Sequence, residues 1–246
     1  MSGKGGVGKS SLTAALAMAL AFRKCQVSVV DQDFDGPCIP RMLGVMGQPA
    51  RLGEQGIIPA INPQGIRVIS TGMMQNVDNQ MITWLNELRR NATEEFLGHV
   101  DYSGTDYLLI DMPPGTSADS VNVMQCLPEL DGAVVVTMPT KVSQEVAKKA
   151  ILFCRKAGVR ILGVVENMSG YVCPHCNNNV NPLLSGGGEE LANEMGVDFW
   201  GRIPIDTRVS ECMDRGESFL DKYPDSLAVQ GVHQLTVLLQ AALDNK

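Results

Sequence analysis

The N-terminal segment GKGGVGKS combines glycines and lysines in the spacing of a phosphate-binding loop. Gly3, four intervening residues and then the triplet of Gly8, Lys9 and Ser10 fit the P-loop pattern. Glycines let the backbone N–H groups of such a loop turn inward toward phosphate oxygens. In this chemistry Lys9 contacts the β- and γ-phosphates, and the Ser10 hydroxyl binds Mg²⁺. The residues predicted to bind nucleotide here are Gly3, Lys4, Gly5, Gly6, Val7, Gly8, Lys9, Ser10 and Ser11.

The loop carries a second lysine, Lys4, which the ordinary P-loop does not need. It stands too early in the loop to take the role of Lys9. Either Lys4 is a solvated surface residue, or it serves a phosphate from elsewhere. The residues alone leave both interpretations open.

Two groups of acidic residues follow apolar runs. Asp111 ends the run YLLI and precedes a stiff Pro-Pro-Gly turn. A carboxylate at the carboxyl end of a strand beside a P-loop is placed to hold Mg²⁺ through water, as a Walker-B residue does. Asp31 and Asp33 follow the run VSVV, a position near the phosphates in a doubly wound sheet. We predict that Asp33 orients the attacking water, that Asp31 binds or supports Mg²⁺, and that Asp35 is a solvated turn residue.

Asn167 follows another apolar run, ILGVVE. Its side-chain amide can both donate to and accept from a purine edge. The alternative is an asparagine that caps a turn.

The segment CPHC places Cys173 and Cys176 in an Asn-rich loop without a strong helix after it, unlike a thioredoxin-type redox pair. Two thiolates cannot complete a four-coordinate metal site alone. Two chains facing each other would supply four, enough for a [4Fe–4S] cluster or for Zn²⁺. The spacing leaves a cluster, zinc and a non-metal role open, with His175 as an exposed spacer. The cysteines expected to pack as small side chains are Cys25, Cys126, Cys154 and Cys212.

The elements that position these residues alternate between short apolar runs and helical patterns. This alternation predicts an α/β fold, a doubly wound and mostly parallel sheet wrapped by helices, in a single domain over 1–246. A metal-binding cysteine loop is expected at about 168–186. The expected strands are 27–31, 66–71, 107–111, 132–138 and 160–166. The expected helices are 10–24, 79–100, 143–157 with Ser143 as its cap, 189–195, 210–216 and 226–244, with an irregular excursion at 45–64.

One expected element is missing, because a buried strand normally leads into a P-loop. Here only Met1 and Ser2 precede Gly3. Losing about five apolar residues from a sheet centre would forfeit roughly 1.5–3 kcal/mol each, which rivals the net stability of a domain. We expect either that the N-terminus is truncated relative to the functional protein, which is the favoured explanation, or that another segment fills the gap.

The composition indicates a globular protein and argues against a membrane-spanning or secreted one. The 246 residues carry a net charge of −7, with 44% hydrophobic and 19% charged residues, as in ordinary globular chains. The acidic balance argues against nonspecific binding to nucleic acid or anionic membrane. No apolar run approaches the ~20 residues of a membrane span, and the P-loop begins too early for a signal peptide. We therefore expect a cytoplasmic protein whose seven cysteines are thiols.

Taken together, these residues resemble the Mrp-type iron–sulfur carrier ATPases, which include the cytosolic iron–sulfur assembly scaffolds. That family belongs to the deviant P-loop ATPases of the SIMIBI class, alongside MinD, ParA and the nitrogenase iron protein. The segments that match are GKGGVGKSS, VVDQDFDGPCIPRMLG, DYLLIDMPPGTSAD, DGAVVVTMPTKVS, ENMSGYVCPHC, SGGGEELANEMGV and GRIPID. The combination of ENMSGYVCPHC with GGGEEL is the most specific, because the other members of the class lack a CxxC there.

The resemblance implies an activity and an assembly. Lys4 matches the signature lysine that reaches the partner's nucleotide across a dimer, so that Lys4, Lys9, Asp33 and Asp111 would form the catalytic set. Cys173 and Cys176 match cysteines that bridge a labile [4Fe–4S] cluster between protomers. Such proteins bind ATP, hydrolyse it slowly and pass the cluster to apo-proteins, as a homodimer or with a related ATPase.

Two features depart from the family pattern, and two other functions stay open. TWLNELRRN around Trp84 replaces a Trp-Arg-Gly-Pro segment, and the acidic residue after PPGT is displaced to Asp119. A positioning ATPase of the MinD or ParA type would need a membrane or DNA surface. A zinc-bridged dimer would use nucleotide as a structural ligand.

Overall fold

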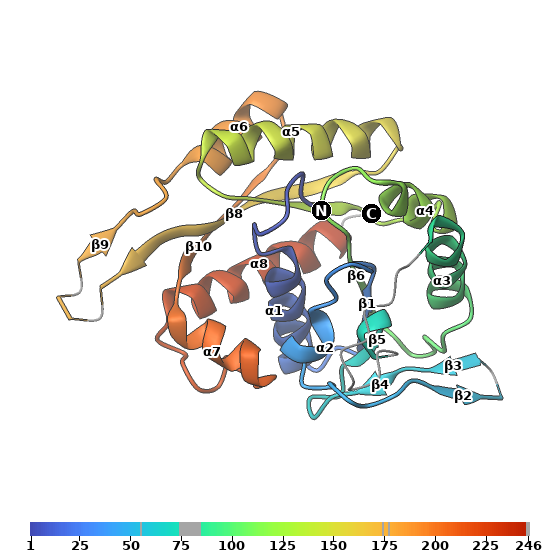
Figure 1. Ribbon diagram of the computed structural model, residues 1–246. Helices are drawn as coiled ribbons and strands as arrows, with labels where there is room; N and C mark the ends of the chain where they lie inside the picture. Colours follow the sequence, from blue (N-terminus) through green and yellow to red (C-terminus); the bar gives the residue numbers. More distant parts are fainter. Residues whose placement is uncertain (55, 74–84, 174, 177, 245–246) are drawn as a thin grey trace.

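The computed structural model describes residues 1–54, 56–73, 85–173, 175–176 and 178–244. Two mostly parallel sheets form its centre, and helices cover them (Figure 1). The first sheet has the order β4–β5–β1–β6 and the second the order β10–β8–β7. The strands of the first are β4 (Ala60–Ile61), β5 (Arg67–Ser70), β1 (Val27–Asp31) and β6 (Tyr107–Asp111). Those of the second are β10 (Phe199–Ile205), β8 (Ile161–Val172) and β7 (Ala133–Thr137), with β9 (Asn179–Val180) paired to the end of β8.

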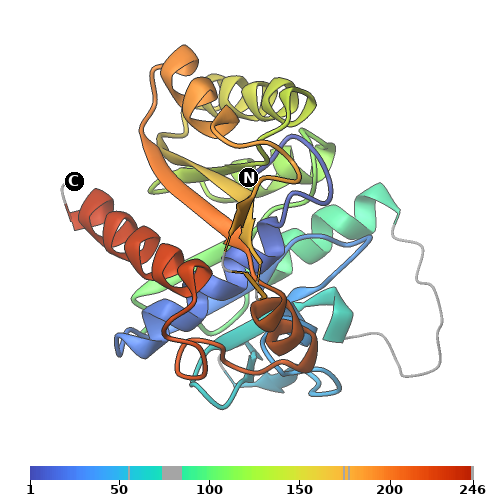
Figure 2. The same cartoon turned by 90° about the vertical axis from the view of Figure 1, so that its left-hand side faces the viewer.

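Helices lie on both faces of the second sheet (Figure 2). On one face are α5 (Lys141–Lys156) and α6 (Gly187–Met195), and on the other α1 (Lys9–Phe22) and α8 (Leu227–Asp244). The remaining helices are α2 (Ile39–Met42), α3 (Asn86–Gly98), α4 (Ala118–Cys126) and α7 (Thr207–Arg215), with a 3₁₀ turn at Thr71–Met73. A small hairpin of β2 (Arg51–Gly53) and β3 (Gly56–Ile58) forms a separate two-stranded sheet. In the described residues, no helix combines the length and apolar character needed to cross a bilayer.

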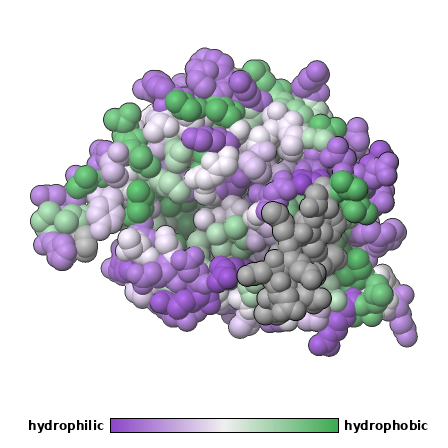
Figure 3. Space-filling view, viewed as in Figure 1, coloured by the Kyte–Doolittle hydropathy of each residue, from purple (hydrophilic) through white to green (hydrophobic). Residues whose placement is uncertain are grey.

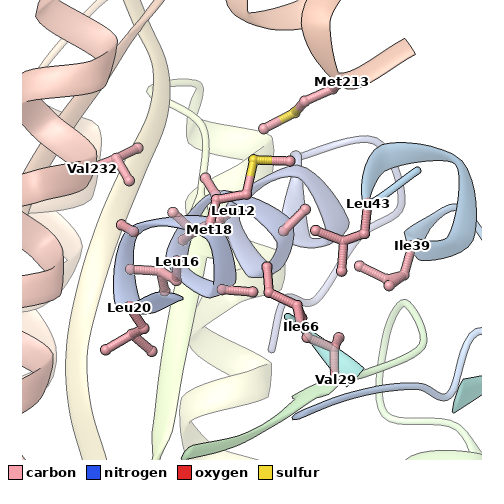
Figure 4. Close-up of a cluster of buried hydrophobic side chains, with 14 of the residues drawn as sticks. Leu12, Leu16, Met18, Leu20, Val29, Ile39, Leu43, Ile66, Met213 and Val232 are labelled. Carbon is pink, nitrogen blue, oxygen red and sulfur yellow. The ribbon is translucent and has the colours of Figure 1, made fainter. Parts of the chain in front are cut away.

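The helix that follows the phosphate-binding loop is the centre of the main core. Leu12, Leu16 and Leu20 of α1 are buried, and the same helix contributes Met18. Figure 4 shows these side chains surrounded by residues of α2, α7, α8 and β1. Because α1 is buried on most of its surface, close packing holds its N-terminus, which follows the glycine-rich loop, in a fixed position.

Most of the expected elements are confirmed to within a few residues. β1 and β6 match the expected ranges, whereas β8 continues well beyond its expected end at 166. The expectation that Ser143 caps α5 was wrong. Thr140 is the N-cap residue, and Ser143 is buried in the first turn. Part of the expected helix 79–100, with Trp84, lies outside the described residues, and α3 begins at Asn86.

The two sheets are separated at the place where a strand leading into the P-loop was expected. β6 is an edge of one sheet, β7 is an edge of the other, and a cavity of about 630 Å³ lies between them. The Met1 amine donates to Val134 O at 2.6 Å, and Val136 N donates to Met1 O at 2.9 Å, which is the pattern of a parallel strand. Burial lowers the pKa of that amine to about 6. No segment within the described residues fills the rest of the gap.

This geometry predicts that an added apolar strand stabilises the fold. Five Val or Ile residues joined to the amine of Met1 would continue the pairing along β6 and β7. Apolar burial of roughly 1.5–3 kcal/mol per side chain, offset by about 1–2 kcal/mol per residue of backbone entropy, leaves a few kcal/mol. We expect Tm to rise by about 5–10 °C in differential scanning calorimetry. A Gly/Ser extension of equal length is the control, and an equal rise for both extensions would contradict strand insertion.

Candidate functional site

The phosphate-binding loop is shaped by glycines and by a contact with β8. Gly8 is the N-cap residue of α1 and has a φ of 86°, in the left-handed region. A Cβ atom there would lie 2.1 Å from Nδ2 of Asn167, so a side chain could not fit without displacing the amide. Lys9 is only 7% exposed, beneath the loop. The first backbone N–H groups of α1 have no side-chain cap from Gly8, and such groups at a helix N-terminus can bind an anion.

Lys4 has the opposite environment. It is exposed, together with Gly5 and Gly6. Among the described residues, no acidic side chain forms an ion pair with its ammonium group, whereas its carbonyl accepts from the Ser2 hydroxyl at 2.8 Å. The backbone of Lys4 is therefore held by a hydrogen bond, while its ammonium group is exposed to solvent.

Asp31 and Asp111 form a buried pair of carboxylates at the carboxyl edge of the sheet. They are register partners in β1 and β6, and each is 1% exposed. Asp31 accepts hydrogen bonds from the Ser70 hydroxyl at 3.1 Å and from two backbone N–H groups. Asp111 accepts from the Thr13 hydroxyl through Oδ1 at 3.1 Å.

Burial raises the pKa of both carboxyl groups above the ordinary value for aspartate. For Asp31 the neighbouring charge of Asp111 raises the pKa further, and the total shift is large. For Asp111 the Ser10 hydroxyl, Lys9 and Thr13 oppose the effect of burial. Two carboxylates this close repel each other, so the site favours a cation or a proton between them.

The hydrogen bonding indicates which oxygen is open to a cation. Oδ2 of Asp111 is buried and has no hydrogen-bond partner among the described residues. Both oxygens of Asp31 already accept hydrogen bonds. A carboxylate oxygen beside the P-loop serine fits the hard oxygen ligands that Mg²⁺ prefers. The chain therefore suits Mg²⁺ at Asp111 and Ser10, with Asp31 as a supporting charge.

The loops that follow β1 and β6 are joined by Arg89 of α3. Its guanidinium bonds to Asp119 at 2.9 Å and pairs with Asp35. Asp35 is thus exposed, as expected, but it is also paired. Asp33 is half-buried in the first loop, where its Oδ1 accepts from Gly36 N at 3.1 Å. The displaced acidic residue Asp119 has a structural role, because through Arg89 it connects the first turn of α4 to the loop that carries Asp33.

Asn167 lies between the phosphate-binding loop and a cavity at the end of β10. Its Nδ2 donates to the carbonyl of Val7 at 3.0 Å, which fastens β8 to the phosphate-binding loop. It borders a cavity of about 350 Å³, together with Ser11, the end of β10 and α7. The amide oxygen is the atom of Asn167 that remains for a ligand, since Nδ2 is engaged.

Cys173 and Cys176 occupy the tip of a hairpin formed by β8 and β9. Tyr171 pairs with Val180, and the amide of Cys173 donates to Asn178 O at 3.0 Å. Cys173 is half-buried and Cys176 is exposed. Backbone N–H groups of His175 and Cys176, and then the Cys176 thiol, hydrogen-bond to the Cys173 sulfur and lower the pKa of this thiol. A lowered pKa favours the thiolate that binds metal.

The hairpin projects from the body of the protein (Figure 1). In Figure 3 it forms a lobe at the left edge, where polar and apolar residues are mixed. In the described part of the chain, no group of three or more His, Cys, Asp or Glu side chains could hold a metal ion. The hairpin therefore presents two thiols, one half-buried and one exposed, as its candidate metal ligands.

Sequence reasoning missed several residues of this site. Ser70 and Thr13 support the two aspartates, and polar residues at the end of the strand 66–71 were the available signal for Ser70. Arg89 gave no signal, because the residues it pairs with are distant in sequence. The cavity wall from β10 was represented in the sequence only by the matching segment GRIPID, and the wall from α7 had no such signal.

A sheet with helices on both faces, a glycine-rich loop entering α1 and carboxylates at the adjoining strand ends define a P-loop NTPase. The chain belongs to the ParA family, in the branch described as NUBPL iron-transfer P-loop NTPase, whose model matches residues 1–239.

Individual relatives agree with this family. The chain is 44% identical to the iron–sulfur cluster carrier protein of Saccharolobus solfataricus, over 92% of this chain and 76% of the relative. It is 41% identical to the cytosolic Fe-S cluster assembly factor NBP35 of Kluyveromyces lactis, over 99% of this chain and 76% of that protein. A solved nucleotide-binding protein of Archaeoglobus fulgidus, in complex with ADP, is 36% identical and superposes with a TM-score of 0.77, covering 88% of this chain and 84% of its own.

Proposed function

We propose that this protein is an ATP-hydrolysing iron–sulfur cluster carrier. Two chains would hold a [4Fe–4S] cluster between their Cys173 and Cys176 thiols and pass it to apo-proteins in the cytoplasm. The observation that carries the proposal is the projecting hairpin, which offers two metal-binding thiols and continues the strand that touches the phosphate-binding loop. The named functions of the relatives support the cargo and the compartment.

The nucleotide half of the proposal assigns roles to the residues around the loop. The backbone from Gly3 to Gly8 and the start of α1 would bind phosphates, and Lys9 would neutralise their charge. Ser10 and Asp111 would hold Mg²⁺, which lowers the energy of the charge that develops during phosphoryl transfer. Asp33, in the loop joined to α4 through Arg89, would orient the attacking water. The cavity beside Asn167 would receive the base.

Anaerobic reconstitution tests this function. The protein is incubated with ferrous iron and sulfide, separated by size, and assayed for iron, sulfide, zinc and oligomeric state, with and without ATP. We expect a dimer that holds about four iron atoms, as one [4Fe–4S] cluster requires. One zinc ion per dimer without ATP turnover would contradict the carrier function and favour a zinc-bridged dimer. A monomer with no bound metal under every condition would contradict both.

Lys4 is expected to act on the nucleotide of the partner subunit. Its exposed side chain and fastened backbone fit a cation that reaches across an interface. Lys4→Ala should lower ATP turnover by roughly 10³-fold, as for trans-acting cations in related chemistry. Its affinity for ADP should change little.

A mixing experiment separates action in trans from action in cis. Equal amounts of Lys4→Ala and Lys9→Ala protein, each inactive alone, would form mixed dimers in which one site has Lys9 and receives Lys4. Random pairing predicts recovery of about a quarter of the wild-type rate. No recovery, despite mixed dimers shown by mass spectrometry, would place Lys4 in its own subunit's site.

A further inference from the structure

A buried carboxylate joins the two limbs of the cysteine hairpin at its base. Glu166 of β8 is 0% exposed. The Ser169 hydroxyl donates to its Oε1 from the outgoing limb. Backbone N–H groups of Gly186, at 3.0 Å, and of Gly188 donate to it from the returning limb. The chain between these anchors, residues 170–185, contains both cysteines.

The returning limb is built to approach this carboxylate closely. A Cβ atom at Gly188 would lie 2.8 Å from Cβ of Glu166, and one at Gly187 would lie 2.0 Å from Nε2 of Gln144. A side chain at Gly188 would push the start of α6 away from β8, and one at Gly187 would push it away from Gln144 of α5. Contact with Glu166 thereby accounts for Gly188, the last glycine of the run SGGG.

The charge of Glu166 is matched by its surroundings. Gly186 is the N-cap residue of α6, so the carboxylate faces the positive end of that helix. Nε of Arg202 lies 3.4 Å from Oε1. A carboxylate accepts all of these donors, whereas the amide of glutamine would present N–H groups to N–H groups on one side. The arrangement therefore depends on a carboxylate and not only on the size of the side chain.

The neighbouring residue on β8 faces the nucleotide site. Successive residues of a strand point to opposite faces of the sheet. Glu166 is directed at α6, and Asn167 is directed at the phosphate-binding loop, where it contacts Val7. The base of the hairpin is thus fixed between the P-loop on one face and α6 on the other.

We propose that Glu166 is a positioning residue that clasps the base of the cysteine hairpin and holds the thiols of Cys173 and Cys176 in the arrangement that a shared cluster needs. The role in cluster retention rests on the proposed function. The clasp itself is a property of the metal-free chain and is measured separately.

The test compares Glu166→Gln with wild type by hydrogen exchange of the Cys173 amide, which bonds to Asn178 at the hairpin tip. This amide is not hydrogen-bonded to Glu166, so faster exchange would show that loosening the base of the hairpin also loosens its tip. We expect exchange to accelerate roughly tenfold and iron to leave the reconstituted protein several-fold faster. ADP affinity should stay within about twofold. The control is Glu189→Gln, which removes an exposed carboxylate from the first turn of α6 that also pairs with Arg202.

Each outcome decides the proposal. Unchanged exchange at Cys173 in Glu166→Gln, or equal acceleration in Glu189→Gln, would overturn it. If Glu166→Gln no longer binds ADP, we take the variant to be misfolded and use Ser169→Ala in its place. This variant removes only the hydrogen bond from the Ser169 hydroxyl to Glu166, and exchange of the Cys173 amide is measured in the same way. If wild type retains no cluster, the proposed function fails, while the exchange result still supports or overturns the clasp.

Discussion

Replacing both Cys173 and Cys176 with serine is expected to reduce iron bound after anaerobic reconstitution to the background level. The broad charge-transfer absorbance between thiolate and iron should vanish with it. The reason is that a serine hydroxyl is not ionised near neutral pH and cannot replace a thiolate ligand. Two subunits together would lose all four candidate ligands.

The same variant should remain folded and bind nucleotide. Cys176 is exposed and Cys173 is half-buried at a hairpin tip, so stability should change by no more than about 0.5 kcal/mol. We expect the affinity for ADP, measured by calorimetry, to stay within about twofold of wild type. A loss of both iron and nucleotide binding would show general damage and not the loss of ligands.

Cys38→Ser is the matched control, because Cys38 is the exposed cysteine outside the hairpin. Although the residue is exposed, its sulfur is partly shielded from solvent, and this desolvation, followed by the charges of Asp31, Asp33 and Asp111, raises the pKa of the thiol and disfavours the thiolate. Cys38→Ser should therefore bind as much iron as wild type. Unchanged iron content in the double variant at positions 173 and 176 would refute the assignment of the cluster to the hairpin.

The second large effect is expected for Asp111→Asn, which should lower ATP turnover by roughly 10²-fold or more. The buried Oδ2 atom of Asp111 has no hydrogen-bond partner in the described structure and is the oxygen best placed to support Mg²⁺. An amide nitrogen at this position cannot bind a cation. Steady-state phosphate release at saturating Mg²⁺ and ATP measures the loss.

Asp111→Asn should also stabilise the nucleotide-free protein. Burial raises the pKa of Asp111 and of Asp31, so the native state holds protons that the unfolded chain has released above its ordinary aspartate pKa. The stability contributed by this pair therefore falls as pH rises through the raised pKa values. Asp111→Asn removes one of the two buried negative charges, so the free energy of unfolding should rise at high pH. At low pH both carboxyl groups are protonated in wild type, and the substitution should change the free energy of unfolding little.

Melting at several pH values checks the sign. The Tm of Asp111→Asn minus that of wild type should be near zero at about pH 4 and should grow to roughly 2–6 °C at about pH 8, since one pKa unit is worth about 1.4 kcal/mol. Asp221→Asn, in an exposed position, should show no such trend. A Tm difference that shrinks with rising pH would contradict the shared burial of the two carboxylates.

Local sequence patterns predicted the core of the fold well. β1 and β6 are continuous apolar runs that end in aspartate, and their expected bounds match the structure. Strands buried on both faces need such runs, so composition alone marks them. The extension of β8 to Val172 was not predicted, because residues 167–172 are mixed in polarity and are held as a strand by β9 and β10. The Ser143 cap was wrong because Thr140 takes that position.

Some residues of the candidate site could likewise be predicted from local sequence patterns, and others could not. The P-loop and the CPHC segment are compact motifs, in which a few adjacent residues contain the chemistry, so the sequence by itself determined a nucleotide site, a pair of candidate metal ligands and the class of fold. Only the tertiary structure decided that Asp31 shares a buried space with Asp111, that Arg89 joins two loops, and that Glu166 clasps the cysteine hairpin. These relations join atoms from segments far apart in the chain, and burial and hydrogen bonding exist only once those segments have packed.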